Sequence, residues 1–74
     1  MNYLVEYFVR NEQGQLVNPY GSDYSFLVKD LKTLKGVINR AKKYAPTEAV
    51  QFSITTYTNL YDLTSYEMVY EGKL

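Results

Sequence analysis

Six of the eight basic residues lie in the stretch KDLKTLKGVINRAKKY at positions 29–44, although the chain as a whole has a formal net charge of zero. Ammonium groups gathered on one surface attract phosphates, so contact with a nucleic-acid backbone is the first chemistry to consider. The residues that would make it are Lys32, Lys35, Lys42 and Lys43. We favour the alternative that they form the water-facing side of a helix, because Lys is a good helix former and the isoelectric point is near 6.1.

The chain also contains nine tyrosines, which is more than the core of so small a domain can hold. Tyrosine combines a large apolar ring with a polar tip, and it is therefore common in protein interfaces. Four interpretations remain open: filling of strand positions, a protein-binding surface, a homodimer interface, and stacking of single-stranded bases. For the protein-binding surface we expect Tyr57, Tyr61 and Tyr66, around the second hairpin, to be the apolar anchors.

Catalytic chemistry finds little support in the residue types that are present. The chain has no cysteine and no histidine, which removes Ser-His-Asp and Cys-His nucleophiles, thiolate metal sites and disulfides. Glu67 and Glu71 form a carboxylate pair four residues apart, which we interpret as solvated strand residues. Phosphate-binding glycine motifs are also missing. We therefore expect a protein that is not an enzyme and that has no catalytic residues, cofactor or metal ion.

The N-terminal half has the pattern of a hairpin. Residues 3–10 are rich in β-branched and aromatic side chains, and residues 11–14 form a polar turn that ends in glycine. A return strand begins at Leu16-Val17, is interrupted at 18–21 by proline and glycine, and resumes over 24–28.

A helix is predicted next, with Asp30 as its N-cap and Pro46 as its stop. Its apolar positions recur every three or four residues within an arc of about 120°, and they are Leu31, Leu34, Val37, Ile38, Ala41 and Ala45. Gly36 lowers helix propensity, which indicates a close contact at that position.

Two further strands complete the pattern. Residues 49–58 alternate in polarity, 59–64 form a turn, and 66–70 form the last strand, with Tyr66, Met68 and Tyr70 on one side. The order ββαββ predicts an α+β fold, in which a four-stranded, mostly antiparallel sheet carries one amphipathic helix on one face. If the last strand lies at a sheet edge, it either invites strand addition or is guarded by Glu67, Glu71 and Lys73.

Length and hydropathy set the remaining expectations. The 74 residues correspond to a single domain over 1–74, for which a homodimer would be one source of added stability. The first ten residues do not read as a signal peptide, and no apolar run is long enough to cross a membrane. We therefore expect a cytoplasmic protein without a membrane partner.

The length, the lack of catalytic residues and the C-terminal stretch FSITTYTNLYDLTSYEMVYEGKL give the chain a resemblance of type to small proteins of bacteriophages and mobile elements, including many anti-CRISPR proteins. This resemblance implies a protein that binds and occludes a host defence complex or a complex that handles nucleic acid, in the cytoplasm of the host. It transfers no site residues. The alternative is a small nucleic-acid-binding module that uses the basic face of the helix.

Overall fold

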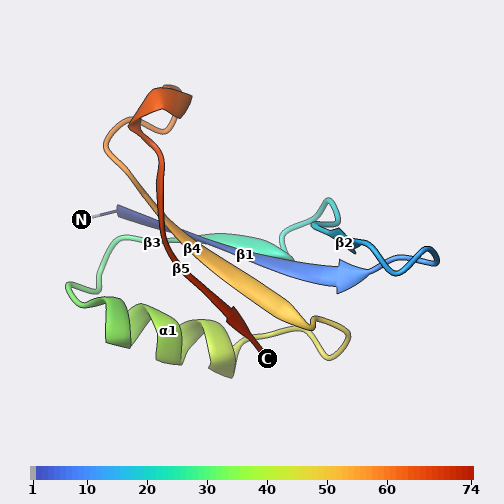
Figure 1. Ribbon diagram of the computed structural model, residues 1–74. Helices are drawn as coiled ribbons and strands as arrows, with labels where there is room; N and C mark the ends of the chain where they lie inside the picture. Colours follow the sequence, from blue (N-terminus) through green and yellow to red (C-terminus); the bar gives the residue numbers. More distant parts are fainter. Residues whose placement is uncertain (1) are drawn as a thin grey trace.

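The computed structural model describes residues 2–74, which form an α+β fold with a single α-helix over one face of an antiparallel sheet (Figure 1). The elements are β1 (Asn2–Arg10), β2 (Leu16–Val17), β3 (Ser25–Val28), α1 (Leu34–Lys43), β4 (Gln51–Tyr57), the 3-10 helix η1 (Leu63–Ser65) and β5 (Glu67–Lys73). The predicted fold class is confirmed. The strand count differs by one, because the return strand of the first hairpin is divided into β2 and β3.

β1 is the central strand. Its one edge pairs with β4, and its other edge pairs with β2 near Val9 and with β3 from Tyr3 to Glu6. The break between β2 and β3 falls where Pro19 and Gly21 predict it. The side-chain amide of Asn18 bridges the break by donating to the main-chain oxygens of Tyr7 and Tyr24, at 2.7 and 3.0 Å.

The helix begins later than its sequence pattern indicates. α1 starts at Leu34 and its N-cap is Thr33, whose hydroxyl oxygen accepts from the N–H of Gly36 at 3.2 Å. The prediction of Asp30 as N-cap is wrong, because its carboxylate instead accepts two hydrogen bonds from the Arg40 guanidinium, at 2.7 and 3.0 Å. A Cβ atom at position 36 would lie 3.1 Å from the Thr33 hydroxyl, which explains the glycine.

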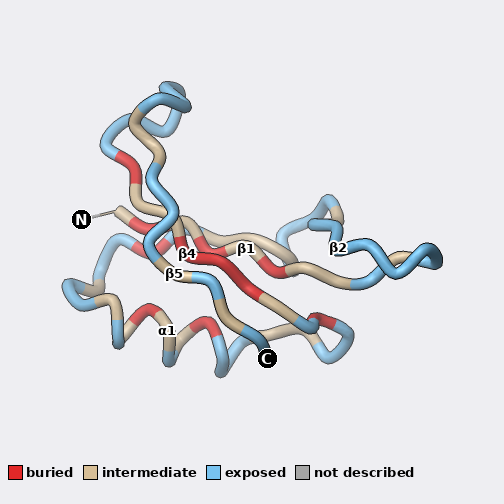
Figure 2. The backbone as a smooth tube through the Cα atoms, in the orientation of Figure 1, coloured by how far each residue is buried: buried red, intermediate tan, exposed pale blue. Residues whose placement is uncertain are grey.

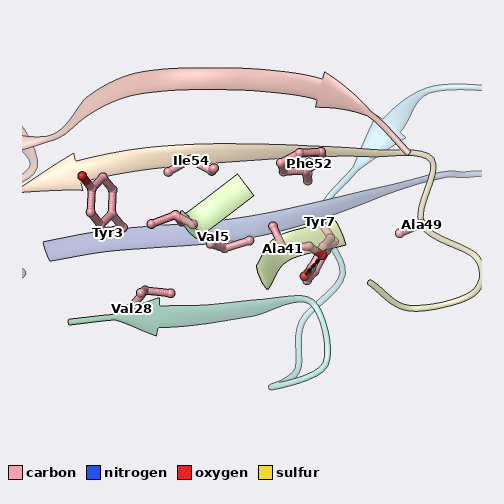
Figure 3. Close-up of a cluster of buried hydrophobic side chains, with 9 residues drawn as sticks. Tyr3, Val5, Tyr7, Val28, Ala41, Ala49, Phe52 and Ile54 are labelled. Carbon is pink, nitrogen blue, oxygen red and sulfur yellow. Dashed lines mark hydrogen bonds between the residues drawn. The ribbon is translucent and has the colours of Figure 1, made fainter. Parts of the chain in front are cut away.

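The core lies between α1 and the sheet, as the buried segments of Figure 2 and the side chains of Figure 3 show. Its buried side chains are Tyr3, Val5, Tyr7, Val28, Val37, Ala41, Ala49, Phe52 and Ile54. The helical stripe predicted from sequence faces this core, with Leu31, Leu34, Ile38 and Ala45 packed around it. The lysines that follow the opposite helical phase therefore remain in water.

β5 departs from simple alternation. Ile54 pairs with Tyr70, whereas the next residue of β4, Thr55, pairs with Met68, so Val69 is an extra residue at a bulge. Tyr70 consequently packs against Phe52 in the core, with ring centroids 5.5 Å apart, while Met68 is exposed. The prediction that Tyr66, Met68 and Tyr70 share one side is therefore wrong for Met68 and Tyr70.

Candidate functional site

The connection between β4 and β5, residues 58–66, projects away from the sheet on the side remote from α1 (Figure 1). We call this segment the tyrosine loop. Its tip exposes 94 % of Tyr61 and 78 % of Leu63, and Leu60 is also exposed. Several large apolar side chains exposed on one short loop are a feature of surfaces that are buried on binding.

Side-chain hydrogen bonds hold the backbone of the tyrosine loop. The Asn59 side-chain oxygen accepts from the N–H of Tyr61 at 3.0 Å. Asp62 caps η1, because its carboxylate accepts from both the N–H and the hydroxyl of Thr64, at 3.0 and 2.6 Å. The hydrogen bonds from Thr64 lower the pKa of the Asp62 carboxyl below its usual value. The loop is therefore shaped before any partner arrives.

Two of the expected anchors form the base of the loop. The rings of Tyr57 and Tyr66 are stacked, with centroids 5.5 Å apart, and the Tyr66 hydroxyl donates to the main-chain oxygen of Leu60 at 2.7 Å. Tyr57 is only 5 % exposed, and its hydroxyl is the one buried side-chain polar atom without a hydrogen-bond partner within residues 2–74. Tyr57 is therefore buried against the ring of Tyr66. Of the three expected anchors, only Tyr61 is exposed enough to be inserted into a partner.

Sequence reasoning missed Leu63, and it did not single out Leu60. The signal that would have found them is the pair of leucines inside the polar stretch TNLYDLTS, because a turn made of Asn, Asp, Thr and Ser has no structural need for apolar side chains. The same stretch carries the Asp-x-Thr pattern of the η1 cap. A rigid turn with exposed leucines is the pattern to recognise.

The second candidate surface consists of Lys29, Lys32, Lys35, Lys42 and Lys43, which we call the lysine surface. All five side chains are exposed. Lys35, Lys42 and Lys43 lie on α1, whereas Lys32 and Lys29 precede its first residue, in the segment that leads from β3 to the helix. The only salt bridge among the described residues joins Arg40 to Asp30 at 2.7 Å, so none of these five ammonium groups has a carboxylate partner there. The four residues predicted for nucleic-acid contact are thus in water and unpaired.

A groove of about 680 Å³ lies beside the end of α1, and it is open to solvent. Its wall combines both signs of charge with two rings, and the lining residues are Ser22, Asp23, Phe26, Arg40, Tyr44, Pro46, Thr47 and Glu48. Arg40 is already bound to Asp30, and Glu48 accepts a hydrogen bond from the Tyr24 hydroxyl, which raises the pKa of that hydroxyl. These mutual contacts occupy Arg40 and Glu48, two of the three charged side chains of the wall.

The carboxylate pair does not form a site. Glu71 lies opposite Ser53 of β4 and Glu67 lies opposite Thr56, so the bulge at Val69 places the two glutamates on different faces of the sheet. Along an unbroken strand, a spacing of four residues would have placed both glutamates on one side. Among residues 2–74 no group of three or more acidic side chains is arranged to hold a metal ion. No helix in that part of the chain is long and apolar enough to cross a membrane.

β5 is an edge strand, since it pairs only with β4. The bulge interrupts the regular row of outward main-chain groups, and Glu67, Glu71 and Lys73 add exposed charges along the same edge. Bulges and charges are the features that protect sheet edges from pairing with other chains. Of the two alternatives for this strand, the structure favours the guarded edge.

Comparisons with protein families, with curated proteins and with solved structures found no match to this chain. The function of the chain is therefore inferred from the tyrosine loop and the lysine surface themselves.

Proposed function

We propose that this protein is a non-enzymatic binding protein that inserts the tip of its tyrosine loop into an apolar pocket of a partner protein. The observation that carries the proposal is the exposure of Tyr61 and Leu63 on a loop whose backbone is fixed by its own hydrogen bonds. A loop whose backbone is already hydrogen-bonded loses less conformational freedom on binding, so more of the apolar transfer energy is retained.

The energy that a few exposed apolar side chains can supply fits such a role. Full burial of a large apolar side chain contributes about 1.5–3 kcal/mol. Binding interfaces commonly depend on a few such anchors, among which tyrosine is frequent. The Tyr57–Tyr66 stack supports the anchors, because the hydroxyl of Tyr66 is bonded to the main-chain oxygen of Leu60 in the loop.

The biological setting that we propose follows from the resemblance to small phage and mobile-element proteins. In that setting the chain is an inhibitor in the cytoplasm of the host, where it occludes a defence complex of the kind that anti-CRISPR proteins block, or a complex that handles nucleic acid. Its mechanism is steric, since the tyrosine loop would occupy a pocket that the complex needs.

The test is affinity capture from the native host with the tagged protein, followed by identification and purification of the captured protein. The dissociation constant is then measured for the wild type, for Tyr61→Ala and for Leu63→Ala. We expect each substitution to weaken binding at least about 30-fold, equivalent to about 2 kcal/mol, the usual threshold for a dominant interface residue.

Tyr20→Ala is the matched control. Tyr20 is a fully exposed loop tyrosine in the segment between β2 and β3, outside the tyrosine loop. Its substitution should leave the affinity within about threefold, a change under 1 kcal/mol. Equal losses for Tyr20→Ala and Tyr61→Ala would refute the assignment of the loop, as would unchanged affinity in both loop variants.

A further inference from the structure

We infer that the lysine surface is a second binding site, which takes the phosphate backbone of duplex nucleic acid without regard to sequence. This inference goes beyond the proposed protein-binding function and does not depend on it, because the tyrosine loop and α1 lie on opposite sides of the sheet (Figure 1).

The charges of the lysine surface are available to a ligand. Lys35, Lys42 and Lys43 project from the side of α1 that is turned away from the buried Val37 and Ala41. No carboxylate of the described residues forms a salt bridge with them, since Asp30, the one acid within 29–43, is bound to Arg40. Residues 29–43 carry a net charge of +5, and the rest of the chain carries −5. The positive charge is therefore concentrated in α1 and the segment before it, even though the whole chain is neutral.

The bound pair of Arg40 and Asp30 also fixes the shape of this surface. It ties the segment before the helix to the last turn of α1, ten residues along the chain. This contact limits the movement of Lys29 and Lys32, which lie close to Asp30 in the chain, relative to the helix. Lys73 adds a sixth ammonium group at the margin, because it lines an open groove together with Lys42.

Phosphate is the anion that this surface suits best. The exposed groups are lysines, which act as point charges toward phosphate. They lack the planar pair of donors with which arginine recognises a base edge. Asn39 is the one exposed amide on the helix, so direct sequence readout is minimal. The apolar stripe of α1 is used in the core, which leaves no apolar face for insertion into a lipid surface. A single aromatic ring, Tyr44, lies beside the lysines, whereas single-stranded binding needs several stacking platforms. Duplex is therefore the favoured form.

Fluorescence anisotropy with labelled duplexes tests the inference. Neutralisation of three to five phosphates predicts that affinity falls about 40- to 500-fold between about 50 and 200 mM salt. Unrelated DNA and RNA duplexes of about 20 base pairs should bind with similar affinity, because only the backbone is contacted. The variant Lys35→Gln/Lys42→Gln/Lys43→Gln should bind more weakly, with a salt slope smaller by about three.

The control variant carries the same change in net charge at the far end of the first hairpin: Arg10→Gln/Gln13→Glu/Gln15→Glu. It should keep most of the wild-type affinity, and circular dichroism should show that both variants are folded. Equal losses in the two variants would overturn the inference, because binding would then follow net charge alone. No binding of duplex up to about 100 μM protein, the weak end of non-specific affinities, would also overturn it. So would binding to phosphatidylserine vesicles in place of duplex, or a strong preference for one sequence.

Discussion

The hydroxyl of Tyr7 on β1 donates a 2.6 Å hydrogen bond to the main-chain oxygen of Ala41, which lies in the last turn of α1 and 34 residues further along the chain. The last carbonyls of a helix have no partner within the helix. In α1 the N–H of Tyr44 returns to Arg40, and the side chain of Tyr7 serves the next carbonyl. One buried tyrosine thus joins the sheet to the end of the helix (Figure 3).

Replacement of Tyr7 by phenylalanine should destabilise the domain. The ring would still fill the core, but the buried oxygen of Ala41 would lose its donor, at a cost of about 1–3 kcal/mol. Urea unfolding measures the change. Tyr3→Phe removes a hydroxyl from the same face of β1, where the described residues offer it no bond to the helix, and it should change stability by less than about 0.5 kcal/mol. Similar values for the two variants would show that the bond contributes nothing.

The same residue predicts alkaline sensitivity. Burial raises the pKa of Tyr7 from 10.0 to about 12. A group whose folded pKa exceeds its unfolded value gives a contribution that is complete below the unfolded pKa and is lost as pH rises toward the folded one. The free energy of unfolding should therefore fall between pH 10 and about 12. Urea titrations across this range should show a shallower fall for Tyr7→Phe than for the wild type, and identical slopes would contradict the argument.

The sheet and the helical phase follow from sequence because period-2 and period-3.6 patterns report directly which face is buried. The helix start does not, since Asp30 and Thr33 are both good capping residues. What separates them is a partner ten positions away, Arg40, which binds the carboxylate of Asp30. Helix-capping propensity depends only on residues that are close in the sequence. The selection of Thr33 over Asp30 as N-cap depends on a contact between residues that are distant in the sequence.

The bulge and the loop show a second kind of limit. Because Val69 is an extra residue in β5, Met68 and Glu67 lie on the opposite faces of the sheet from those that simple alternation from Tyr70 predicts. The local sequence gives no sign of this bulge. The burial of Tyr57 likewise depends on Tyr66, nine residues later and on the far side of the turn. The tyrosines therefore indicate the region of the candidate site, whereas the burial of Tyr57 and the exposure of Tyr61 within it depend on contacts across the turn.

Helix capping offers a direct comparison between the two candidates for the N-cap. Thr33→Ala removes the oxygen that accepts from Gly36 and should cost about 1 kcal/mol. Asp30→Asn keeps the size of the side chain and weakens only an exposed ion pair, so its effect should be smaller. Chemical unfolding of both variants decides the order. A larger loss for Asp30→Asn would mean that the helix begins at the earlier residue in solution.

Gly72 should be intolerant of a side chain for a reason that a second substitution can remove. A Cβ atom there would lie 2.7 Å from a ring carbon of Tyr70. We expect Gly72→Ala to cost about 1–3 kcal/mol through overpacking. In the background of Tyr70→Ala the same change should cost much less, and a double-mutant cycle of unfolding free energies measures the coupling. Additive effects would place the cost in the backbone instead of in this contact.

The order of the tyrosine loop should depend on the carboxylate of Asp62. Asp62→Ala removes both bonds to Thr64 and should speed amide exchange and protease cleavage within residues 58–66, while the global unfolding free energy stays close to the wild-type value. Glu12→Ala, an exposed acid in the turn of the first hairpin, is the control and should change neither rate.

Because its hydrogen bonds lower the pKa of Asp62, the folded loop is favoured above the ordinary value of 3.8 and loses that support only as pH falls through the lower folded value. An NMR titration of the Thr64 amide should therefore show a midpoint below 3.8. A midpoint at or above that value, together with unchanged exchange in Asp62→Ala, would mean that the cap does not hold the loop and that Tyr61 and Leu63 are presented by a mobile segment.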